Sequence, residues 1–442
     1  MVRTLAAQGT LTWMLLATGS QAATYYVSPT GSSNNNGSAS SPWRQIRDAL
    51  PHVVPGDLVL VADGSYLGFT MEDINGAAGA PITIRATGLN CLVTVTTDRP
   101  DNRDTIKITF CSYIVIDGLR AFVANRAGVR VDSSNNVTVR NGVYGNNTTW
   151  GIFTNHSNNL LIEYNECYGS VVEHGIYVSN ACVNPTVRCN RSHDNRGNGL
   201  HFNGDASQGG TGLITGALVE KNVIYNNGLG GGAGINMDGV RSSVIRNNLL
   251  YNNHASGIAL FRQNGAQGPS GIAVYHNTID MASDGRWALL IGQSDTNAGM
   301  ILVRNNILNN RNTARGGTSF VSATDVANTD SDYNIMDKAT PNDGNNVYTL
   351  AQWKAQGHEP HSLSATNASL FVNANGGDYH LLDTSPARGK GQPLASVTDD
   401  MDGVPRPPLG PTDIGCYHKM GKLTGIRAQD AGGGPGDTQG DP

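Results

Sequence analysis

Three short stretches, Gly151-Ile-Phe-Thr-Asn155, Gly175-Ile-Tyr-Val-Ser179 and Gly199-Leu-His-Phe-Asn203, repeat one pattern and decide the fold. In each, a glycine precedes a short strand whose first residue is aliphatic and whose alternate side chains face opposite sides. Four further copies begin at Gly128, Gly234, Gly257 and Ala288, and successive copies start 23, 24, 24, 35, 23 and 31 residues apart. A repeat of this period is typical of a solenoid built from stacked coils.

A second repeat, in which an asparagine follows an aliphatic residue by three positions, runs between the strands at the same period. Its members are Asn141, Asn165, Asn190, Asn222, Asn248, Asn277 and Asn306. We expect these asparagines at a turn, because asparagine tolerates left-handed backbone angles and its amide can bond to the asparagine of the next coil. The pattern therefore predicts a scaffold role for them.

The composition fits a solenoid and limits the classes of partner that we expect. Charged residues are 15% of the 442-residue chain, against roughly 25% in a typical globular protein, and the 55 glycines supply tight turns. The formal net charge is −5 and no basic patch stands out, so we expect no nucleic-acid partner. We also expect a monomer.

The N-terminus has the pattern of a secretory signal peptide over residues 1–23. Arg3 precedes a modestly apolar stretch, Leu11-Thr-Trp-Met-Leu-Leu-Ala17, and small residues close it near Ala22 and Ala23. No later stretch reaches the ~18 apolar residues of a membrane span. We therefore expect a protein exported to the periplasm or the extracellular space, with no membrane span.

The rest of the chain divides by regularity. Residues 24–60 are expected to form an N-terminal cap and first strand, with a capping helix at Trp43–Leu50, because the end of a solenoid needs cover. Residues 61–418 form the solenoid, with regular coils over about 105–310 and irregular later coils that include a helical segment at Leu350–Ala355. Residues 419–442, with several glycines, are expected to be disordered.

Several segments resemble one known group of proteins. The opening Tyr25-Tyr-Val-Ser-Pro-Thr-Gly31, the segment Pro55-Gly-Asp-Leu-Val-Leu-Val61 and the closing Asp413-Ile-Gly-Cys-Tyr417 are similar to exported repeat proteins of the pectin-lyase-like superfamily. The resemblance implies an all-β fold, a single right-handed parallel β-helix, over nearly the whole mature chain. That superfamily contains polysaccharide lyases, glycoside hydrolases and uronate epimerases, so the fold does not decide the reaction.

The strand repeat predicts which side chains share the outer face. The residue after each glycine points inward and forms an aliphatic stack, and the next residue points outward. Stacked coils are about 4.8 Å apart, so Tyr177, His201 and Asn236 should be successive rungs of one column. Polar residues of these types on adjacent rungs exceed what a solvated face requires, and two long repeats place loops beside them.

Candidate site residues follow from these columns. The candidate catalytic residues are His201, His174, Tyr177, Asp205 and Asp238. The candidate substrate-binding residues are Trp150, Phe153, Asn203, Asn236, Arg262, Arg286 and Trp287. Flat aromatic rings and cations suit the binding of acidic sugars, so we expect a polysaccharide substrate.

Several kinds of function remain open from the sequence. Among them we favour a lyase that acts on a uronic-acid polymer by β-elimination, with His201 or His174 as the base and Tyr177 as the acid. A glycoside hydrolase would use Asp205 and Asp238 as its two carboxyl groups. A uronate epimerase would abstract the same C5 proton as the lyase. A glycan-binding protein without turnover would use the aromatic rings alone.

No metal site is assigned from the sequence, and Ca²⁺ is the one cofactor that it leaves open. The proposed face lacks the cluster of carboxylates that binds calcium in calcium-dependent pectate lyases. A calcium site on this face would therefore have few negatively charged ligands. The six cysteines lack zinc-site spacing. Pairs between neighbouring coils, Cys91 with Cys111 and Cys167 with Cys189, and free buried thiols are equally compatible with the sequence.

Tyr144, Tyr168, Tyr225 and Tyr251, with His193 among them, predict an aromatic packing column on another face.

Overall fold

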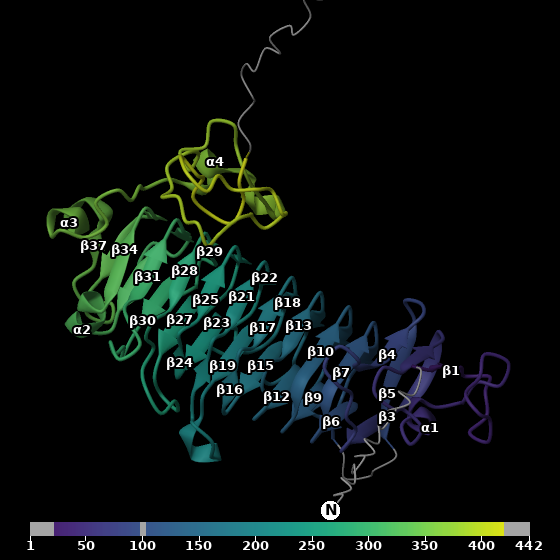
Figure 1. Cartoon of the computed structure of the whole chain (residues 1–442). Coiled ribbons are helices and arrows are strands. Elements are labelled where there is room, and N and C mark those ends of the chain that lie inside the picture. The colour runs from purple at the N-terminus through teal and green to yellow at the C-terminus, as the bar shows by residue number, and fades with distance from the viewer. Residues whose placement is uncertain (1–21, 98–102, 420–442) are drawn as a thin grey trace, which may run out of the picture.

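The computed structural model describes residues 22–97 and 103–419. The predicted signal peptide and the predicted disordered tail lie almost wholly outside the described residues. The coils stack along one axis from β1 at the N-terminal end to β37, and the C-terminal segment with α4 (Asn367–Leu370) lies beside the last coils (Figure 1). No helix in the described part of the chain combines the length and apolarity that crossing a membrane would take.

Three ladders of strands form the walls of the solenoid, and their pairing is parallel except at the last pair of one ladder. The first is a 12-stranded sheet made of β1 (Thr24–Val27), β2 (Leu58–Val61), β4 (Ile82–Ala86), β7 (Ser112–Asp117), β10 (Asn135–Arg140), β13 (Leu161–Glu163), β17 (Thr186–Arg188), β21 (Leu218–Glu220), β25 (Val244–Arg246), β28 (Ala273–Tyr275), β31 (Ile301–Arg304) and β34 (Thr329–Asp332).

The other two ladders join through β3 (Gly64–Glu72). One, which we call the site ladder, contains β6 (Ile106–Thr109), β9 (Ala127–Asp132), β12 (Trp150–Asn155), β15 (Ile176–Ser179), β19 (Leu200–Asn203), β23 (Ala233–Asp238), β27 (Ser256–Phe261), β30 (Leu289–Ile291), β33 (Thr318–Phe320), β36 (Lys338–Thr340) and β37 (Tyr348–Thr349). The other contains β5 (Cys91–Thr97), β8 (Arg120–Phe122), β11 (Val143–Gly145), β14 (Glu166–Tyr168), β18 (Arg191–His193), β22 (Val223–Tyr225), β26 (Leu249–Tyr251), β29 (Thr278–Met281), β32 (Ile307–Asn310) and β35 (Ile335–Met336). A short sheet of β16 (Cys182–Val183), β20 (Ile214–Thr215) and β24 (Val240–Arg241) lies at a corner.

The aliphatic stack predicted for the site ladder is confirmed. Its inward residues are 0 or 1% exposed: Val129, Ile152, Ile176, Leu200, Ile235, Ile258 and Leu289. The glycine before each strand has a steric reason, because the carbonyl oxygen of the next coil passes close above it. A Cβ added at Gly151 would lie 2.6 Å from the Gly175 oxygen, and one at Gly175 would lie 2.8 Å from the Gly199 oxygen. Glycine thus lets successive coils approach closely enough to pair.

A ladder of buried asparagine amides joins the coils, with one difference from the sequence prediction. Each side-chain amide donates to the asparagine oxygen of the next coil, for example Asn190 to Asn222 at 3.0 Å and Asn222 to Asn248 at 2.9 Å. The ladder runs from Asn165 through Asn306 to Asn334. Asn141 is not part of it, because Gly142 occupies that rung and its N–H donates to Asn165.

The expected left-handed backbone lies one residue before the asparagine ladder. Positive φ values occur at Cys189 (54°), Lys221 (56°) and Asn247 (53°), each directly preceding a ladder asparagine. The ladder asparagines themselves serve as amide bridges. A second asparagine ladder, Asn195, Asn227 and Asn253, was not foreseen; its amides are joined at 2.9 and 3.1 Å.

The two ends of the chain differ from the regular coils. Helix α1 spans Ile46–Ala49, shorter than the predicted Trp43–Leu50, and its role as a cap stays a prediction. Helix α2 (Ala323–Ala327) precedes β34, and α3 (Leu350–Ala355) confirms the predicted helical segment. The later chain forms α4 and an antiparallel pair, β38 (Phe371–Asn373) and β39 (Asp378–Leu381).

The C-terminal segment packs against the flank of the middle coils. Phe371, Tyr379 and Leu381 form a second apolar cluster with residues of the coils, among them Leu249 and Ile307. Polar contacts join the same surfaces, since the Lys221 ammonium lies 2.6 Å from Asp399. All six cysteines are free thiols, so the structure contains neither of the disulfides considered from the sequence.

The asparagine ladder gives the first prediction. Asn222→Ala removes the acceptor of two Asn190 N–H groups and the donor to Val187 and Asn248, all inside the solenoid. Because buried polar partners would lose their hydrogen bonds, the free energy of unfolding should fall by about 2–4 kcal/mol in chemical denaturation. Asn34→Ala, at an exposed position, is the control and should change it by less than about 0.5 kcal/mol. Equal stabilities of the two variants would contradict the role of the ladder.

Candidate functional site

The outward side chains of the site ladder form one continuous column. The strand register places Lys107, Arg130, Phe153, Tyr177, His201, Asn236, Ala259 and Leu290 on successive rungs. We call these residues the site column. The predicted succession of Tyr177, His201 and Asn236 is therefore confirmed. Ser179, Asn203 and Asp238 form the neighbouring column.

Tyr177 and His201 form a stacked pair at the centre of the column. Their ring centroids are 4.4 Å apart and the rings are nearly parallel, at 9°. The Asn203 side chain donates a hydrogen bond to the Tyr177 hydroxyl at 3.1 Å. The His174 ring meets the His201 ring edge-on, with centroids 4.5 Å apart. The parallel strands thus bring a phenol, two imidazoles and an amide together on adjacent coils.

Three buried polar atoms in this cluster have no hydrogen-bond partner. They are Nδ1 of His201 and the Oδ1 atoms of Asn203 and Asn236. Buried polar groups in proteins are nearly always paired, because an unpaired one costs free energy. Three such atoms on adjacent rungs indicate a place where a polar ligand completes the hydrogen bonds.

Burial sets opposite protonation tendencies on the stacked pair. It lowers the pKa of the His201 imidazole from 6.5 to about 3, so the ring is neutral at neutral pH. Burial also raises the pKa of the Tyr177 hydroxyl, while the Asn203 hydrogen bond acts in the opposite direction. The cluster therefore holds a neutral imidazole that can accept a proton next to a phenol that retains its own.

His174 has structural partners that His201 lacks. Its Nδ1 accepts from the Asn198 backbone N–H at 3.0 Å, and its Nε2 lies 3.5 Å from the Glu173 carboxylate. Burial, and then the His201 ring, holds the pKa of His174 well below its ordinary value. Its lone pair is occupied, so the geometry favours His201 over His174 as the group that accepts a proton.

The predicted aromatic platform is largely covered by its neighbours. Phe153 is 7% exposed, with the Trp150 ring stacked on it at 4.3 Å and the Arg130 guanidinium 4.8 Å from its centroid. Trp150 is partly exposed and donates from Nε1 to Glu173 at 2.8 Å. Of the two rings, Trp150 is therefore the better placed to contact a sugar.

The two candidate carboxylates serve the loops. Asp238 is 2% exposed and accepts three backbone N–H groups, from Gln263 at 2.8 Å, Asn264 at 2.7 Å and Gly265 at 3.0 Å. Asp205 caps a short 3₁₀ helix, η1 (Ala206–Gln208), through the Ser207 N–H and hydroxyl at 2.8 and 2.7 Å. These contacts give each carboxylate a structural role in the loops beside the column.

The two loops expected beside the column pair with one another. The Ala206 N–H donates to the Asn264 oxygen at 3.0 Å, and the Ala266 N–H donates to the Gly212 oxygen at 2.9 Å. Asp238 anchors one of these loops directly. The loops therefore form a fixed wall along the Asn203 side of the column.

A cavity of about 540 Å³ continues the column beyond His201. Asn236, Ala259 and Leu290 form its floor, and Arg286 and Trp287 line it together with Phe261. This volume falls within the roughly 300–1,000 Å³ of small-molecule sites. Arg286 is exposed, whereas Trp287 is 4% exposed. Arg262 is exposed and lies outside the cavity lining; its backbone N–H donates to the Gln293 side chain at 3.2 Å.

Two cations of the site column were missed as site residues. Lys107 and Arg130 are partly exposed and occupy the rungs before Phe153. Arg130 is paired with Asp132 at 2.8 Å and lies 4.0 Å from Asp104. Lys107 could have been found by extending the repeat one coil toward the N-terminus, where Thr105-Ile-Lys-Ile-Thr109 replaces the usual glycine by threonine.

No group of three or more histidine, cysteine, aspartate or glutamate side chains within residues 22–97 and 103–419 is arranged to hold a metal ion.

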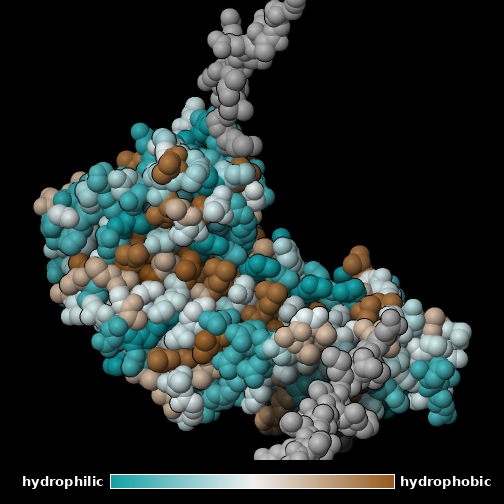
Figure 2. All heavy atoms as spheres, viewed as in Figure 1, coloured by the Kyte–Doolittle hydropathy of each residue, from teal (hydrophilic) through white to brown (hydrophobic). Residues whose placement is uncertain are grey.

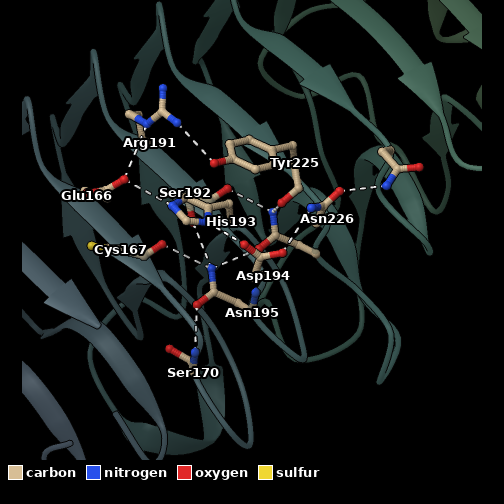
Figure 3. A network of polar contacts seen from close by, with 12 residues as sticks. Glu166, Cys167, Ser170, Arg191, Ser192, His193, Asp194, Asn195, Tyr225 and Asn226 are labelled. Carbon is tan, nitrogen blue, oxygen red and sulfur yellow. Dashed lines mark hydrogen bonds and ion pairs between the residues drawn. The ribbon is translucent and has the colours of Figure 1, made fainter. Parts of the chain in front are cut away.

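A second polar network lies on another face, around His193 (Figure 3). Its Nδ1 lies 2.6 Å from Asp194, its Nε2 lies 3.2 Å from Glu166, and its ring is stacked between Tyr168 and Tyr225 at 5.2 and 4.6 Å. Both nitrogens and both ring faces are thus occupied, as expected of a packing column. The inclusion of Tyr144 in that column was wrong, because Gly145 occupies the rung beside Tyr168 and Tyr144 is fully buried.

Comparisons with known proteins agree with this architecture. The family model described as "Right handed beta helix region" matches residues 82–222. A pectate lyase, Pel9A, has a TM-score of 0.61 at 18% identity, with 91% of this chain and 97% of that chain covered. The chain folds as a right-handed parallel β-helix.

Two further β-helix structures are more distant. An alginate lyase from Paenibacillus sp. strain FPU-7 has a TM-score of 0.46 at 18% identity, with 67% of this chain and 97% of that chain covered. A rhamnogalacturonan lyase has a TM-score of 0.37 at 15% identity, with coverages of 64% and 81%. Both scores are too low to carry an argument. A search of curated proteins found no match.

The burial of His201 gives a second prediction. The folded β-helix protonates this ring only near pH 3, whereas the unfolded chain does so near 6.5, so unfolding takes up a proton between these values. Stability should therefore fall as the pH drops from 6.5 toward 3, with His201 contributing up to about 1.4 kcal/mol per pH unit. Denaturation at pH 7, 5 and 4 should show a smaller fall in His201→Gln than in the wild type or in His254→Gln, which lies on another face. Identical pH profiles would contradict the buried neutral ring.

Proposed function

We propose that this β-helix is a secreted polysaccharide lyase that cleaves a uronic-acid polymer by β-elimination along the site column. The observation that carries the proposal is the set of three unpartnered buried polar atoms on His201, Asn203 and Asn236 beside the Tyr177 hydroxyl. The fold, shared with a pectate lyase, supports a polysaccharide as the substrate class. The export pattern of the N-terminus accords with an extracellular polymer.

β-Elimination needs three groups, and the cluster supplies them. A base removes the C5 proton of the uronate, donors stabilise the charge that develops on its carboxylate, and an acid protonates the leaving oxygen. His201 is neutral and its Nδ1 is unpartnered, so it is the proposed base. The side-chain N–H groups of Asn203 and Asn236 are the proposed donors to the carboxylate, their Oδ1 atoms would accept from sugar hydroxyls, and Tyr177 is the proposed acid.

Substrate charge would adjust the base. In the free protein burial disfavours the charged imidazole, which weakens His201 as a proton acceptor. A uronate carboxylate bound on the next rung would favour the imidazolium and raise the pKa of His201. The bound substrate therefore makes His201 a stronger base, whereas His201 is a weak base in the free protein.

A glycoside hydrolase is less well supported. Its two carboxylates, Asp205 and Asp238, are engaged by the N–H and hydroxyl donors of the loops, and Asp238 accepts three of them. A general acid and a nucleophile or base must instead face the glycosidic bond. A glycan-binding protein without turnover would use the same column. Only an assay of turnover distinguishes it from the lyase.

The third prediction tests the reaction. A panel of uronic-acid polysaccharides is followed by the ultraviolet absorbance of the unsaturated product, together with a count of new reducing ends. His201→Ala and Tyr177→Phe should each lower kcat by about 100- to 10,000-fold, the range for removal of a general acid or base. Their denaturation midpoints at pH 7 should stay near the wild-type value.

The control for this test is His254→Ala, whose ring pairs with Asp284 on another face and which should keep full activity. New ends without absorbance would replace the lyase by a hydrolase. Neither signal, with retained affinity for a polysaccharide, would replace the enzyme by a binding protein.

The fourth prediction concerns the cations at the N-terminal end of the column. Lys107 lies four rungs from His201, or about 19 Å at about 4.8 Å per rung, so its ammonium would bind a remote uronate of the chain. Lys107→Met should raise KM about 3- to 10-fold with kcat nearly unchanged, as expected for loss of uniform binding. A large fall in kcat with KM unchanged would instead place Lys107 in the chemistry.

A further inference from the structure

The site column is accessible at His201 but completely covered at its C-terminal end. Leu290, the last rung of the column, is partly exposed and lines the cavity. The next two rungs, Ser319 and Thr340, continue the same outward direction but are 0% exposed. Outward positions of a β-helix face solvent unless something lies over them, so the groove ends between Leu290 and Ser319.

Two loops, residues 311–317 and 341–346, form the cover, which we call the end wall. The Asp343 N–H donates to the Phe320 oxygen at 2.8 Å, and the Thr340 hydroxyl donates to the Asn345 oxygen at 2.6 Å. The Asn310 side chain donates to the Gly316 oxygen at 3.2 Å. Lys338 of β36 holds the first loop through a hydrogen bond from Nζ to the Thr313 oxygen.

The end wall carries charge into the cavity. Arg315 from one loop and Asp343 from the other both line it, together with Asn236 and Arg286. Arg286 and Arg315 are exposed, and neither has an ion-pair partner among the described residues. Phe261, which is partly exposed, adds a ring surface, whereas Trp287 lines the cavity but is only 4% exposed. Guanidinium groups suit a carboxylate, a carboxylate suits sugar hydroxyls, and aromatic faces suit a sugar ring.

The other end of the column has a different character. Lys107 and Arg130 are partly exposed, so the column continues past Phe153 in the described structure, with Lys107 beyond Arg130, which is paired with Asp132. Figure 2 shows this elongated body with apolar side chains in separate patches among polar ones on the face in view. A chain lying on the column can therefore extend toward Lys107, whereas it meets the end wall beyond Leu290.

We infer that the cavity between His201 and the end wall binds the terminal acidic sugar of a polysaccharide chain, so that the protein acts from chain ends. The inference rests on the proposed function for the position of cleavage. His201 and Leu290 are three rungs apart, about 14 Å at about 4.8 Å per rung. A terminal unit seated against Arg315 and Asp343 places a nearby linkage beside His201, and a short oligosaccharide is released.

The fifth prediction tests the end wall first by binding. Tyr177→Phe protein is titrated with one uronic-acid polysaccharide prepared at two average lengths. End recognition predicts that the amount of protein bound follows the number of chain ends, so the shorter preparation binds more at equal mass. Binding that follows total mass would overturn the inference, and so would the absence of binding to every polysaccharide.

A variant pair locates the contact in that titration. Arg315→Ala should weaken binding of a short uronate oligosaccharide about 10-fold, since it removes a charge from the cavity. Arg44→Ala, an exposed arginine near the N-terminal end of the described chain, is the matched control and should bind as the wild type does. Equal affinities of the two variants would remove Arg315 from the site.

Turnover by the wild type gives the second arm. End action predicts one short product from the earliest time points and a slow fall in viscosity. A ladder of products with a rapid fall in viscosity would overturn the inference and leave the lyase proposal standing. End-dependent binding without any turnover would overturn the lyase and leave the closed cavity as a chain-end binding site.

Discussion

The buried amide ladder on which the coils stack is the constraint that the rest of the structure depends on. Each asparagine from Asn165 to Asn306 donates to the asparagine of the next coil, and that asparagine's oxygen also accepts the backbone N–H of the donor residue, as far as Asn334. A slip of one residue would leave these groups unpaired inside the solenoid, where the cost is high. The register of the site ladder is fixed as a result, and with it the vertical contact of Tyr177, His201 and Asn236.

That fixed register explains how the polar cluster around His201 is held in place although it is largely buried. The His201 ring is stacked on Tyr177 and is kept neutral by burial, while its Nδ1 and two amide oxygens stay without partners. Such a cluster is costly in the free protein and is maintained because the stacked coils over-determine it. Asp238 contributes indirectly, since it anchors the loop that walls the cluster.

The sequence predicts the fold much better than the site. The inward aliphatic residues and the rung order follow from a two-residue alternation and a constant period, which are visible in a single chain. The asparagine repeat is visible too, but Asn141 shows its limit, because a residue at the turn and a residue in the ladder look alike one position apart. Tyr144 fails in the same way, since its neighbour Gly145 occupies the outward rung.

The chemistry of the site depends on contacts that cross between coils and cannot be read from spacing. Asp238 has the residue type of a catalytic group, yet three backbone N–H groups of a distant loop occupy it. Phe153 has the type of a sugar platform, yet Trp150 and Arg130 cover it. Conversely, Lys107 is not predicted as a site residue, because its coil lacks the glycine that begins the repeat in most other coils. The end wall arises from two loops with no repeat signal at all.

The central claim is that the polar cluster around His201 binds the reacting sugar. The crystal structure of the Tyr177→Phe protein with a uronate oligosaccharide tests it most directly. The account predicts a sugar ring within hydrogen-bond distance of His201 Nδ1, Asn203 and Asn236, with the chain running toward Lys107. A saccharide bound only elsewhere, such as along the stacked rings around His193, would contradict it.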